Sequence, residues 1–151
     1  METLKNTFKV KETFKDRTIG FWIGLAASGL FLISTIIFII LYSGDNVFFH
    51  PDERDRVRIA WVCTFFFIGV IFQGVAIITD LKFAQMIPVV FYSIGIGLYL
   101  YLAMFPIADF LMGVEFFGGT LPSVIAFAVI FLLGAVAAVI SCFLNQRKTE
   151  N

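Results

Sequence analysis

The segment IGFWIGLAASGLFLISTIIFIILY, residues 19–42, contains no Asp, Glu, Lys, Arg or His. A helix of about 20 residues crosses the roughly 30 Å hydrocarbon core of a bilayer. Because lipid cannot hydrogen-bond exposed backbone groups, such a segment must be a helix or a barrel strand. Barrel strands are about 10 residues long and alternate in polarity, whereas this run is continuously apolar. The segment therefore predicts a transmembrane helix.

Three further segments share this character, at about 59–79, 86–104 and 123–144, and none contains a charged residue or histidine. The composition agrees, since 60% of the 151 residues are apolar and the mean hydropathy is +0.94, against about 45–50% apolar residues in a soluble domain. The connection 80–85 is short enough to make its two spans antiparallel. The predicted fold is an all-α integral membrane protein, a single domain over residues 19–144 with four transmembrane helices in an antiparallel up-down-up-down bundle.

The positive charges are distributed unevenly across the four predicted spans. One side carries eight: Lys5, Lys9, Lys11, Lys15, Arg17, Lys82, Arg147 and Lys148. The other side carries three: Arg54, Arg56 and Arg58. Cytoplasmic loops are enriched in Lys and Arg. We therefore expect a protein of the cell (plasma) membrane whose N-terminus and C-terminal tail, residues 145–151, are both cytoplasmic.

The N-terminal segment, residues 1–18, precedes a span that is too long for a signal peptide and lacks its small-residue cleavage pattern. Helical spacing puts its apolar residues on one broad side together with two lysines: Leu4, Phe8, Val10, Phe14, Lys11 and Lys15. This pattern suits an amphipathic helix at the membrane interface. The alternative interpretation is a cytoplasmic tail without regular structure.

Small residues recur at helical spacing in the first span, at Gly20, Gly24 and Ser28. The fourth span has a comparable surface: Gly134, Ala137, Ala138, Ser141 and Cys142. Small residues let membrane helices approach closely. We expect helix packing at these positions, either of the two surfaces on each other within the bundle or of one surface on a partner subunit.

Gln73 is a polar residue in the inner half of the second predicted span. An amide in hydrocarbon requires a partner, although interhelical polar contacts contribute only about 0.6 kcal/mol on average. One hypothesis is a structural hydrogen bond to Ser93 or Tyr92. The other is contact with a substrate or ion.

Residues that bind metals or act in catalysis are scarce. The histidine, His50, stands beside Asp52 and Glu53, which could form a cation site, but this segment is better explained as the solvated start of a helix. Cys63 and Cys142 make no zinc-type spacing. Neither a cofactor nor nucleic acid is expected as a ligand.

The third connection, 106–122, is unusually apolar for a loop. Pro106 and Asp109 suit the start of a short helix and Gly113 suits its end. We expect this helix to lie flat on the outer end of the bundle, either as a lid or as a surface that contacts a lipid or a partner. The candidate surface comprises Ile107, Asp109, Phe110, Leu111, Glu115, Phe116 and Phe117.

These features rank three classes of function. The first is a non-catalytic subunit or interaction protein that acts through helix–helix and outer-loop contacts, with the bilayer, other membrane proteins or further copies as partners. The second is a transporter or channel component, which at this size requires an oligomer; the absence of charge within the spans weighs against it. The third is an integral membrane enzyme, for which no catalytic constellation is visible.

Overall fold

The computed structural model describes residues 17–42, 53–79, 82–114 and 121–144. In this part of the chain lie four long helices, α2 (Ile19–Tyr42), α3 (Glu53–Thr79), α4 (Met86–Leu111) and α5 (Leu121–Phe143). A short 3-10 helix, η1 (Lys82–Gln85), leads into α4. All four long helices are apolar and long enough to cross a membrane, which confirms the predicted all-α fold of four spans. The predicted N-terminal interfacial helix and the cation site at His50 lie outside the described residues.

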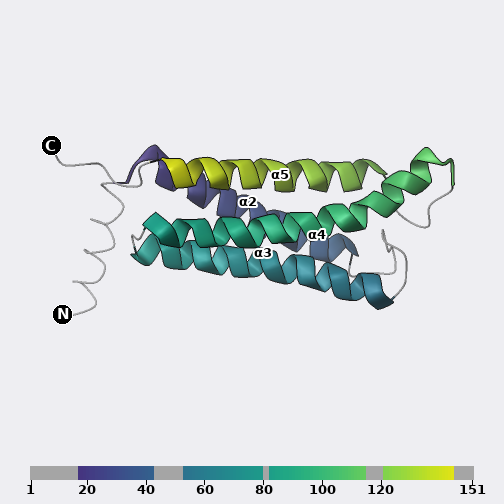
Figure 1. The fold of residues 1–151 in the computed structure, drawn as a ribbon, viewed down its shortest axis with the longest axis horizontal. Coiled ribbons are helices and arrows are strands. Elements are labelled where there is room, and N and C mark those ends of the chain that lie inside the picture. Colours follow the sequence, from purple (N-terminus) through teal and green to yellow (C-terminus); the bar gives the residue numbers. More distant parts are fainter. Residues whose placement is uncertain (1–16, 43–52, 80–81, 115–120, 145–151) are drawn as a thin grey trace.

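The helices form a bundle in which chain neighbours are antiparallel (Figure 1). α2 packs against α3 and α5, and α4 packs against the same two helices. The bundle therefore has α2 and α4 on one diagonal and α3 and α5 on the other. We call the end where α2 begins and α5 finishes the terminal end, and the end where α2 and α4 finish the opposite end.

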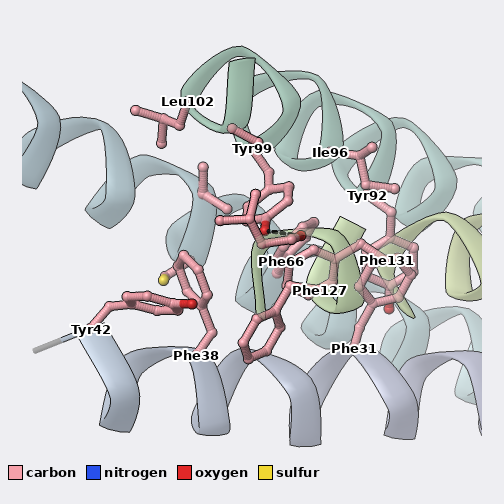
Figure 2. Packing of buried hydrophobic residues seen from close by; sticks show 14 of the residues in the cluster. Phe31, Phe38, Tyr42, Phe66, Tyr92, Ile96, Tyr99, Leu102, Phe127 and Phe131 are labelled. Atoms are coloured by element: carbon pink, nitrogen blue, oxygen red, sulfur yellow. Dashed lines mark hydrogen bonds between the residues drawn. The ribbon is translucent and has the colours of Figure 1, made fainter. Parts of the chain in front are cut away.

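Aromatic rings from all four helices fill the centre of the bundle (Figure 2). Phe31 of α2 stacks on Tyr92 of α4 with ring centroids 4.0 Å apart, which bridges one diagonal. Phe66 of α3 and Phe131 of α5 bridge the other diagonal, with ring centroids 4.6 Å apart. Lipid tails are as apolar as the side chains, so helix association in a membrane depends on such close packing rather than on the hydrophobic effect. The rings supply it through large contact areas and favourable ring–ring geometry.

The third connection differs from the prediction. No separate helix starts at Pro106; instead α4 continues through Pro106 to Leu111. Proline removes one backbone donor, which leaves the carbonyl of Leu102 without its usual partner and bends the helix. Membrane helices tolerate this loss better than soluble ones. The last turns of α4 accordingly turn away from its main axis and project past the end of α5, rather than lying flat on the bundle (Figure 1).

α4 ends at Leu111, and Gly113 is the helix-terminating residue that the sequence predicts. Gly113 has a φ of 72°, a left-handed conformation that glycine adopts without a side-chain clash. Its N–H donates to the carbonyl of Phe110 at 3.1 Å, and the N–H of Val114 donates to the carbonyl of Asp109 at 3.0 Å. These two bonds form a Schellman motif, which satisfies carbonyl groups that a helix end otherwise leaves unpaired.

Candidate functional site

The small-residue surfaces of α2 and α5 face each other near the terminal end. Ser141 Oγ donates a hydrogen bond to the carbonyl of Gly20 at 2.8 Å. A Cβ atom added at Gly24 would lie 2.5 Å from the same Ser141 oxygen, so glycine is what permits the helices to approach this closely. Further along the helices, a Cβ at Gly134 would lie 3.0 Å from the ring of Phe31.

All five positions selected for helix packing are buried within the bundle: Gly20, Gly24, Ser28, Gly134 and Ala138. The small-residue surface of α2 is thus covered by α5 of the same chain. A partner subunit could reach it only by displacing α5.

Gln73 is buried and lies beside this α2–α5 contact. Its Nε2 atom is 3.3 Å from the position that a Cβ of Gly24 would occupy. The amide and the Ser141 hydroxyl therefore approach the same glycine from α3 and α5. Ser93, one of the two expected partners of Gln73, is exposed, and its hydroxyl donates to the carbonyl of Val89 at 2.8 Å.

Two further polar contacts join helices, and neither was expected from the sequence. Tyr99 Oη donates to the carbonyl of Val124 at 2.8 Å, which ties α4 to α5 inside the core (Figure 2). Cys142 Sγ donates to the carbonyl of Gln85 at 3.1 Å, which ties the end of α5 to the start of α4. In the described part of the chain, the buried hydroxyls of Thr35 and Tyr92 have no hydrogen-bond partner. Ser28 is near Tyr92, but the geometry between their hydroxyls is not that of a hydrogen bond.

The contact between α3 and α4 is built on two glycines that the sequence analysis did not select. A Cβ added at Gly69 would lie 2.5 Å from the ring of Tyr92, and one at Gly95 would lie 2.5 Å from the ring of Phe66. Each helix thus supplies an aromatic ring and, three residues later, the glycine that receives its neighbour's ring. The aromatic-x-x-Gly spacing that both helices share is the sequence pattern that could have predicted this contact.

The candidate surface of the third connection is only partly described. Ile107 packs against the core and Asp109 is half-buried. Phe110 and Leu111 are 59% and 78% exposed. Glu115, Phe116 and Phe117 lie outside the described residues. The described members therefore sit on the end of α4 that projects from the bundle.

Cationic side chains near the helix ends lie over aromatic rings. Arg17 is buried at the terminal end, with its guanidinium carbon 4.9 Å from the ring centroid of Phe21. At the opposite end the guanidinium carbon of Arg58 is 5.2 Å from the ring centroid of Tyr101. Tyr101 is 46% exposed, and tyrosine is enriched at the membrane–water interface.

Acidic and metal-ligating side chains are few in the described part of the chain. Asp109 is the one carboxylate among residues 17–42, 57–76, 84–114 and 121–144, and within the described region no three His, Cys, Asp or Glu side chains gather as metal ligands.

Comparison with known proteins gives no family for the chain. No protein-family model matches it, and neither a curated protein nor a solved structure is significantly similar to it.

Proposed function

We propose that this four-span membrane protein is a non-catalytic subunit or interaction protein that acts through the lipid-facing sides of its helices and its outer connection. The observation that carries the proposal is the filled centre of the bundle. Phe31, Phe66, Tyr92 and Phe131 meet there with centroid separations of 4.0–6.2 Å. A solute pathway along the bundle axis would require these rings to separate.

The polar groups inside the bundle support the same proposal. Ser141, Tyr99 and Cys142 each donate to a backbone carbonyl of a neighbouring helix. In these bonds they hold helices together, and their donor hydrogens are not available to a substrate. The function is then expected on surfaces that the bundle presents outward.

One outward surface suited to a partner helix lies on α2. Ala26 is exposed, and a Cβ added at Gly29 would meet nothing within 4 Å. Small residues on a lipid-facing side let another transmembrane helix approach closely. This side of α2 is distinct from the Gly20–Gly24 side, which α5 covers.

The orientation of the protein is part of the proposal. Eight Lys and Arg residues lie on the side of both termini and three on the other side. We therefore place the protein in the plasma membrane with its terminal end on the cytoplasmic side.

Affinity purification after mild detergent extraction, followed by native mass spectrometry, tests the proposal. We expect the chain at a fixed ratio to a second membrane protein. Gly29→Leu should remove this partner, whereas the matched variant Gly97→Leu, on α4 and also with nothing within 4 Å of its added Cβ, should retain it. A homo-oligomer that passes solute in liposomes would replace the proposal with the transporter or channel alternative.

A further inference from the structure

We draw no further inference here: the strongest candidate, the exposed apolar surface patch of Phe110, Leu111 and Met112 at the end of α4, carries none because nothing in the structure shows what covers it.

Discussion

The ring of Phe66 on α3 lies directly on Gly95 of α4, where an added Cβ would be 2.5 Å from ring carbon Cε1. The same arrangement is repeated in reverse by Tyr92 on Gly69. Both rings are held from behind, since Phe66 contacts Phe131 at 4.6 Å and Tyr92 stacks on Phe31 at 4.0 Å. The α3–α4 contact therefore has little freedom to accept additional atoms.

Gly95→Ala should destabilise the protein because its methyl group would displace the Phe66 ring. Overpacking of this kind typically costs about 1–3 kcal/mol. Gly97→Ala is the matched control two residues away, where an added Cβ meets nothing within 4 Å. It should be neutral, or stabilising by up to about 1 kcal/mol through helix propensity. Thermal unfolding in one detergent compares the two; equal stabilities would contradict the close packing.

Gly24→Leu should loosen the α2–α5 contact. Its Cβ alone would lie 2.5 Å from Ser141 Oγ and 3.3 Å from Gln73 Nε2, so the side chain must push α5 away and break the Ser141–Gly20 hydrogen bond. We expect a loss of about 1–3 kcal/mol. Gly29→Leu, in the same helix but with open space around the added Cβ, should unfold close to the wild-type temperature. If Gly24→Leu also unfolds close to the wild-type temperature, the packing described for α2 and α5 is incorrect.

The number and type of the helices follow from the sequence because the bilayer imposes them. Uncharged segments of this length have to be helices in lipid, and short connections make neighbours antiparallel. The course of α4 was harder to predict because of Pro106. An internal proline usually kinks or ends a helix in soluble proteins, but a membrane span accommodates it.

The rotation of each helix about its own axis was less accessible to prediction. A membrane helix is apolar all round, so apolar periodicity does not separate its buried side from its lipid-facing side. Gln73 could for this reason be placed in the second span but not beside Gly24. The aromatic-x-x-Gly spacing at Phe66 and Tyr92 has meaning only once the two helices are known to be antiparallel and in register.

Single-cysteine labelling in intact cells should establish the orientation of the bundle. The charge distribution predicts that positions 5, 82 and 148 are cytoplasmic, whereas positions 52 and 115 are external. In a chain lacking Cys63 and Cys142, a membrane-impermeant maleimide should label only the last two. Labelling at position 82 without permeabilisation would reverse the assigned orientation.

Two buried tyrosines on one side of α4 should respond differently to the same substitution. Tyr99 Oη donates to the carbonyl of Val124 at 2.8 Å, while the Tyr92 hydroxyl has no hydrogen-bond partner among the described residues. Tyr99→Phe loses an interhelical bond and should cost about 0.6 kcal/mol, the average for such contacts in membranes. Tyr92→Phe removes an unsatisfied buried hydroxyl and keeps the ring stacked on Phe31, so stability should be unchanged or slightly higher.

Both substitutions leave the aromatic ring in place, which makes the comparison specific to the hydroxyls. Chemical unfolding in mixed micelles can resolve the difference, and a larger loss from Tyr92→Phe than from Tyr99→Phe would show that Tyr92, not Tyr99, holds the more important polar contact of the core.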